Sequence, residues 1–117
     1  MKTAVILSAR QDKDTSVPYP LKAYHDNVCL MDRTIEALTA LDYTNIYLIV
    51  GGQAQMYHKY ASDHVHLVLN PDYKFTSSMG SLACAAPYIQ DDFLLVEGDT
   101  FYEYKVLKAL SETDNEN

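Results

Sequence analysis

Residues 93–99 read Phe-Leu-Leu-Val-Glu-Gly-Asp, an apolar run that ends at once in a carboxylate, a glycine and a second carboxylate. A short continuous apolar run with such an ending is typical of a parallel strand that is covered on both faces of its sheet. The stretch therefore predicts a buried strand over residues 93–96, with polar groups delivered just beyond its carboxyl end.

Three earlier apolar runs have the same character, and a helix-period segment follows each of them. Strands that alternate with helices predict an α/β fold with a mainly parallel sheet. The predicted strands are residues 3–7, 45–50, 65–69 and 93–96. The predicted helices are residues 30–41, 53–61, 79–86 and 103–110.

Right-handed crossovers limit the order in which four parallel strands can lie. The simplest order is 3-2-1-4, which gives a three-layer α/β/α Rossmann-like sandwich. In that order the chain reverses direction across the sheet between the first and the fourth strand. Ligands of open α/β sheets bind at such a switch point, beside the carboxyl ends of the strands. The loop over residues 8–22 and Glu97-Gly98-Asp99 both lie there, so we expect a binding site at this edge.

Length and charge set the broad class of the protein. The 117 residues fit one domain, predicted over residues 1–110, with a polar acidic tail over 111–117. The net charge is -7 and no basic cluster is visible, which argues against nucleic acid and anionic membranes as partners. The opening apolar run ends at Ser8 and is too short for a signal sequence or a membrane span.

Two residue types allow narrower expectations about packing and compartment. The two cysteines, Cys29 and Cys84, are distant in sequence, and buried free thiols suit a reducing cytoplasm, where we expect the protein to reside. There are ten tyrosines. We expect a group of them to be half-buried at the rim of the core: Tyr57, Tyr60, Tyr73, Tyr88, Tyr102 and Tyr104.

Three groups of residues at the predicted edge could carry chemistry. Asp99 could hold Mg²⁺ on a triphosphate, because magnesium prefers one or two carboxylates together with phosphate oxygens and water; the alternative is an aspartate that caps the next helix. Arg10 and Lys22 could neutralise phosphate charge in a loop that contains no glycine, or they could be solvated surface charges. Gly80-Ser81 could let a flat ligand approach the first turn of a helix, or could serve helix–sheet packing.

In their order and spacing these stretches resemble the sugar-phosphate-type nucleotidyltransferases, and look closest to the choline-phosphate and aminoalkylphosphonate cytidylyltransferase-like branch. Ala4-Val5-Ile6-Leu7-Ser8-Ala9 is similar to the start of the family signature, which usually reads I-L-A-A-G-x-G-x-R. Three further similarities follow in chain order: Pro20-Leu21-Lys22 with Leu30-Met31-Asp32-Arg33-Thr34, Asn70-Pro71-Asp72-Tyr73 through Ser78, Gly80, Ser81 and Leu82, and Leu95-Val96-Glu97-Gly98-Asp99.

The resemblance implies transfer of a nucleotidyl group, with cytidylyl favoured, from a nucleoside triphosphate to a phosphate or phosphonate acceptor, with release of pyrophosphate. It implies that Ser8, Ala9 and Arg10 lie against the nucleotide and that Gly80 and Ser81 lie near the base. It also implies that Lys22 is the catalytic phosphate-binding lysine and that Asp99 binds Mg²⁺. Lysine and Mg²⁺ would stabilise charge in the transition state.

The chain departs from the family pattern at the loop. Arg10 stands where the first signature glycine is expected, the second glycine is missing, and Lys22 is offset by a residue or two. The family's acceptor-binding half and second metal carboxylate come after the region covered here, which implies a fragment of a longer chain or a degenerate domain. A non-catalytic nucleotide-binding, regulatory or oligomerisation module is therefore the alternative function, and homo-oligomerisation stays open.

Overall fold

The computed structural model describes residues 2–9, 19–21, 28–52, 54–71, 78–89 and 92–98. Its four strands are parallel and form one sheet in the order β3-β2-β1-β4. The strands are β1 (Lys2–Ser8), β2 (Tyr43–Val50), β3 (Val65–Leu69) and β4 (Leu94–Glu97). The predicted Rossmann-like α/β fold and the predicted strand order are confirmed.

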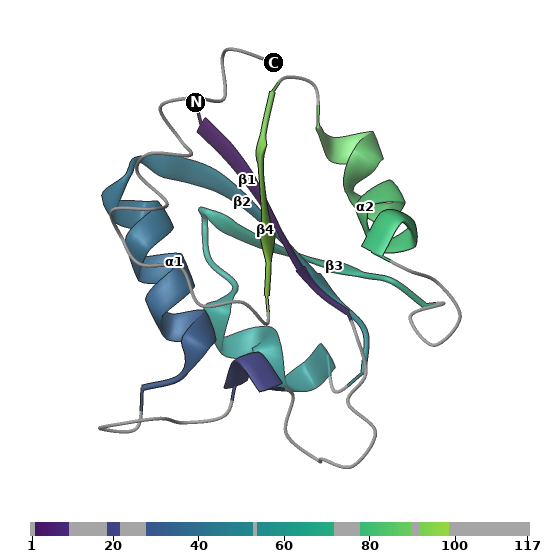
Figure 1. The fold of residues 1–117 in the computed structure, drawn as a ribbon, viewed down its shortest axis with the longest axis horizontal. Helices are drawn as coiled ribbons and strands as arrows, with labels where there is room; N and C mark the ends of the chain where they lie inside the picture. Colours follow the sequence, from purple (N-terminus) through teal and green to yellow (C-terminus); the bar gives the residue numbers. More distant parts are fainter. Residues whose placement is uncertain are drawn as a thin grey trace.

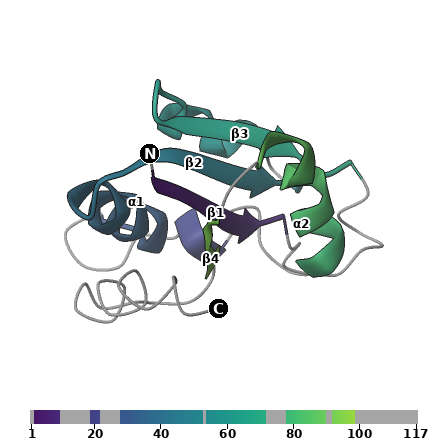
Figure 2. The same cartoon turned by 90° about the horizontal axis from the view of Figure 1, so that it is seen from above.

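Helices cover both faces of this sheet, as the two views in Figure 1 and Figure 2 show. On one face lie α1 (Leu30–Ala40) and the 3-10 helix η3 (Ala54–Tyr60). On the opposite face lies α2 (Ser78–Ala85), which is followed directly by the 3-10 turn η4 (Ala86–Tyr88). The arrangement is the three-layer sandwich expected from the alternation of strands and helices.

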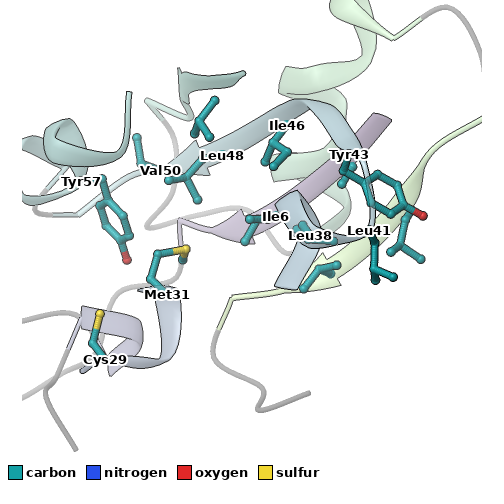
Figure 3. Packing of buried hydrophobic residues seen from close by; sticks show 14 residues of the cluster. Ile6, Cys29, Met31, Leu38, Leu41, Tyr43, Ile46, Leu48, Val50 and Tyr57 are labelled. Carbon is teal, nitrogen blue, oxygen red and sulfur yellow. The ribbon is translucent and has the colours of Figure 1, made fainter. Parts of the chain in front are cut away.

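The period of two along β1 divides its side chains between two cores. Ala4 and Ile6 point into the core under α1 and η3, whereas Val5 and Leu7 point into the core under α2. Figure 3 shows the first of these cores, in which Ile6 lies among side chains of β2 and α1. Because β1 is apolar at consecutive positions, it can occupy the centre of the sheet and hold both layers of helices.

The boundaries of the elements differ from the predicted ones by a few residues. Residues 54–60 form a 3-10 helix. Helix α2 ends at Ala85, and the 3-10 turn η4, which contains Pro87, follows it. Helix α1 ends one residue earlier than predicted, and Asp42 follows it with a φ of 68°. An aspartate tolerates this left-handed conformation just after a helix.

Some predicted segments lie outside the described residues. They are the predicted helix over 103–110, the tail over 111–117 and most of the loop after Ser8. Of that loop, the structure describes the short 3-10 helix η1 (Tyr19–Leu21). Tyr57 was expected at the rim but is fully buried, whereas Tyr88 is 54% exposed. Cys29 and Cys84 are free cysteines, the first buried and the second half-buried. Among the described helices, none has the length and apolar character needed to cross a membrane.

A polar network joins η3 to the start of α1. The Tyr60 hydroxyl donates a hydrogen bond of 2.6 Å to Asp32 Oδ1, and the Cys29 backbone N–H donates one of 3.2 Å to Asp32 Oδ2. The Cys29 thiol lies 3.2 Å from the Tyr60 hydroxyl oxygen. Partial burial raises the pKa of Asp32, but the hydrogen bonds from Tyr60 and Cys29 outweigh it, so the pKa lies below its ordinary value of 3.8. Burial and the bond to Asp32 raise the pKa of Tyr60, which keeps this hydroxyl neutral as a donor.

This network predicts an acid-dependent part of the stability. Because the folded-state pKa of Asp32 is below its unfolded value, the carboxylate stabilises the fold at pH values above the unfolded pKa. That contribution is lost as the pH falls through the folded pKa. Denaturant unfolding between about pH 6 and about pH 3 should therefore show a smaller acid-induced loss for Asp32→Asn than for the unsubstituted chain.

Glu36→Gln is the matched control, because Glu36 lies on the exposed side of the same helix. Its unfolding free energy should follow the unsubstituted chain at every pH. An identical acid response of Asp32→Asn and the unsubstituted chain would contradict the stabilising role of the network.

Candidate functional site

Buried polar side chains gather at one edge of the sheet, where all four parallel strands have their carboxyl ends. The described residues contain four such buried polar side chains: Ser8, Thr34, Asn70 and Ser81. Three of the four are at this edge, because Ser8 ends β1, Asn70 follows β3, and Ser81 is bonded to Asn70. The edge predicted from strand order is therefore the place where the chain concentrates hydrogen-bonding groups inside the protein.

The ends of β1 and β4 are held together at Gly98. Its backbone N–H donates a 2.8 Å hydrogen bond to the Leu7 carbonyl oxygen. A Cβ at this position would lie 2.5 Å from Ser8 Oγ and 2.7 Å from the Leu7 oxygen. None of the described glycines has a positive φ, so Gly98 is needed for space and not for backbone conformation. Gly98 therefore lets the end of β4 lie directly against the end of β1.

The Ser8 hydroxyl is engaged inside the protein. Ser8 Oγ lies 3.1 Å from the Tyr57 hydroxyl oxygen, and either group can donate the proton. The Ala9 side chain is buried in the opposite core, under α2. Both residues were expected to lie against a nucleotide. The Ser8 side chain instead contacts Tyr57, and the Ala9 side chain is buried under α2. Main-chain atoms are therefore what the end of β1 offers to a ligand.

A second polar pair ties α2 to the same edge. The Asn70 side-chain amide donates a 3.1 Å hydrogen bond to Ser81 Oγ, and the Asn70 backbone N–H donates one of 2.8 Å to the Val50 carbonyl oxygen. Val50 is also the register partner of Ser8 in the β1–β2 pair. One row of contacts therefore crosses the whole edge, in the order Gly98, Ser8, Val50, Asn70 and Ser81, which we call the edge row.

The structure describes some of the predicted site residues and not others. Ser8 and Ser81 belong to the edge row, Ala9 follows Ser8, and half-buried Gly80 precedes Ser81 in α2. The other three, Arg10, Lys22 and Asp99, lie outside the described residues. In the described ranges, no group of three or more His, Cys, Asp or Glu side chains is placed to hold a metal.

Two residues of this region were missed as contributors. Asn70 belongs to a stretch that carries the family resemblance but was assigned no role, although an amide directly after a strand is a signal for a group delivered to the edge. Tyr57 gave no signal, because a single tyrosine in a short helix does not reveal which way it points. Its burial depends on where η3 returns over the sheet, and that is a property of the tertiary structure.

Comparison with known proteins gives distant similarity to curated proteins. No protein-family model matches the chain. It is similar to a CMP-5'-(3-aminopropyl)phosphonate synthase of Streptomyces rubellomurinus (strain ATCC 31215), with 28% identity over 87 residues. The similar region covers 70% of this chain and 14% of the relative. The chain thus spans a small part of the relative's length, and the similarity is to a protein whose name states that it makes a CMP-linked phosphonate.

The close approach at Gly98 predicts a large effect of one added methyl group. Gly98→Ala should lower the free energy of unfolding by about 1–3 kcal/mol, because an overpacked contact forces the ends of β1 and β4 apart. Equilibrium denaturant unfolding measures this loss. The same substitution should cost less in a Ser8→Gly background, because Ser8 supplies two of the three nearest atoms. An equal cost in both backgrounds would contradict the packing at this contact.

Proposed function

We propose that this chain binds a nucleoside triphosphate together with Mg²⁺ at the edge row, with CTP favoured. We further propose that it forms the nucleotide-binding part of an enzyme that transfers a nucleotidyl group to a phosphate or phosphonate acceptor. The observation that carries the proposal is the edge row itself, which lies at the switch point between β1 and β4, where open α/β sheets bind ligands. The similarity to a CMP-phosphonate synthase supports the class of reaction and the choice of base.

The charges of a triphosphate restrict which part of the chain can hold it. The described Lys and Arg residues are Lys2, Arg33 and Lys59. Lys2 donates to the Leu41 carbonyl oxygen at the end of α1, Arg33 is exposed, and Lys59 lies over the Tyr60 ring. We assign the positive charge to the loop after Ser8, as the family resemblance implies. In the proposal Arg10 and Lys22 bind the phosphates, and Lys22 stabilises the charge that develops on them in the transition state.

The start of α1 is a poor alternative site for phosphate. A helix N-terminus attracts anions through its free N–H groups and its dipole. Here the Asp32 carboxylate already accepts the Cys29 N–H at that position and is held ionised by Tyr60. A phosphate in the same place would meet a negative charge. This favours binding above the edge row, beside the loop after Ser8.

The carboxylates after β4 suit a magnesium ion. Gly98 lies directly against the end of β1, and Asp99 is the next residue in the sequence. In the proposal Asp99 holds Mg²⁺, and half-buried Glu97 lies two residues before it. Mg²⁺ prefers one or two carboxylates together with phosphate oxygens and water. When bound, it would neutralise charge on the triphosphate while an acceptor oxygen attacks the α-phosphorus and pyrophosphate leaves.

A non-catalytic nucleotide-binding module is the second candidate, favoured by the loop composition. The residues between Ser8 and Lys22 include no glycine, and glycine is what lets a backbone approach phosphates closely. A chain of this kind would bind the nucleotide without turning it over. Pyrophosphate release in the presence of CTP, Mg²⁺ and 3-aminopropylphosphonate would identify the enzyme and exclude the non-catalytic module.

The binding proposal predicts a Mg²⁺-dependent interaction that needs Asp99. Isothermal titration calorimetry with CTP, and then with other triphosphates, should detect binding that weakens by at least about tenfold when Mg²⁺ is omitted, since the ion shields the phosphates. Asp99→Asn should cause the same loss. Asp92→Asn is the matched control, because Asp92 is exposed and precedes β4 at the opposite end of the strand; its affinity should be unchanged. Lack of binding by every triphosphate would overturn the proposal.

A further inference from the structure

Tyr57 is the largest fully buried side chain among the described residues, with no exposed surface. Figure 3 shows it in the core under α1 and η3, on the same side of the sheet as Met31 and Ile6. Its ring fills this core in the way that a phenylalanine would. Its hydroxyl, however, reaches Ser8 Oγ at 3.1 Å, a residue 49 positions away in sequence. This bond links the core directly to the last residue of the central strand.

Ser8 is held from three sides. Tyr57 contacts its hydroxyl, Gly98 lies against its side chain, and Val50 is its register partner in β2. Gly98 also limits how Ser8 Oγ can turn, since the space beside it is already filled. The position of Ser8 at the end of β1 is therefore fixed by these contacts.

We propose that Tyr57 is a positioning residue of the triphosphate site, which acts through Ser8 to hold the end of β1 in its binding orientation. The inference rests on the proposed function, because it assumes that the triphosphate binds at the edge row beside Ser8. Tyr57 does not touch the ligand. It removes conformational freedom from the end of β1 before the ligand arrives, and such preorganisation increases affinity by reducing the cost of ordering on binding.

Loss of the Tyr57 hydroxyl has a defined physical consequence. In Tyr57→Phe the ring still fills the core, but Ser8 Oγ loses a buried partner. A buried hydroxyl without that partner is unfavourable by about 1–3 kcal/mol, so Ser8 turns or shifts to find another one. Either response moves the end of β1 against Gly98. The site should therefore lose affinity even where the fold persists.

Tyr60 provides a matched control in the same 3-10 helix. Its hydroxyl makes partly buried hydrogen bonds, but to Asp32 and Cys29 at the start of α1 and not to a strand end. Tyr60→Phe should lower stability by an amount similar to that of Tyr57→Phe, or larger, because its partner is a carboxylate. It leaves Ser8 and the edge row in place. Tyr60→Phe should therefore lose stability and keep its affinity, whereas Tyr57→Phe should lose both.

The experiment measures the dissociation constant for CTP with Mg²⁺ and the denaturant midpoint for five chains: unsubstituted, Tyr57→Phe, Tyr60→Phe, Ser8→Ala and Tyr57→Phe/Ser8→Ala. We expect Tyr57→Phe and Ser8→Ala each to weaken binding by about three- to tenfold, the range of one hydrogen bond. The double variant should lose less affinity than the product of the two single losses, because the bond between Tyr57 and Ser8 is shared by both substitutions. Tyr60→Phe should bind within about twofold of the unsubstituted chain.

The outcomes separate the two proposals. If the unsubstituted chain binds CTP but Tyr57→Phe binds equally well, the role of Tyr57 is overturned and the proposed function stands. The role is also overturned if the losses in Tyr57→Phe and Ser8→Ala multiply in the double variant, or if Tyr60→Phe loses as much affinity as Tyr57→Phe. If the unsubstituted chain binds no triphosphate, the proposed function fails and this inference fails with it.

Discussion

The burial of β1 on both faces is the constraint on which the rest of the structure depends. Ala4, Val5 and Ile6 have no exposed surface, and successive side chains enter opposite cores. A strand that is apolar at four consecutive positions, as β1 is from Ala4 to Leu7, is buried best between two layers and two neighbouring strands. Once β1 takes the centre, β2 and β4 lie on either side of it. The switch point then falls at its carboxyl end, beside Ser8.

The buried polar side chains at that end of the sheet form hydrogen bonds with one another, so they are not left without partners. Buried hydroxyls and amides are costly unless they are hydrogen-bonded. Ser8 pairs with Tyr57 and Asn70 pairs with Ser81, and in the described part of the chain no buried side-chain nitrogen or oxygen lacks a partner. Each pair joins a strand end to a helix on one face. The edge row therefore fixes the positions of η3 and α2 relative to the sheet, as well as forming the candidate site.

The sequence predicts those features that local patterning controls. The four strands are visible as apolar runs, and the strand order follows from crossover handedness, so the fold was accessible without a structure. The candidate site was accessible only in part. Ser8 and Ser81 were found at the ends of elements, whereas the partner of each hydroxyl depends on tertiary contacts between distant segments. Tyr57 illustrates the limit: whether it is buried or at the rim is decided by the path of η3 over β2, which no local pattern encodes.

These contacts bear on the absence of glycine from the loop after β1. Nucleotide-binding turns commonly use glycines, which permit unusual backbone conformations and close approach to phosphates. This chain has none between Ser8 and Lys22, and its glycine at the switch point is Gly98, on the neighbouring strand. Because Gly98 has no side chain, it leaves space for the Ser8 side chain between Tyr57 and the end of β4. Order at the end of β1 thus comes from the contacts of the Ser8 side chain. A site built in this way would depend on Tyr57 and Gly98 to fix the end of β1 before the ligand binds.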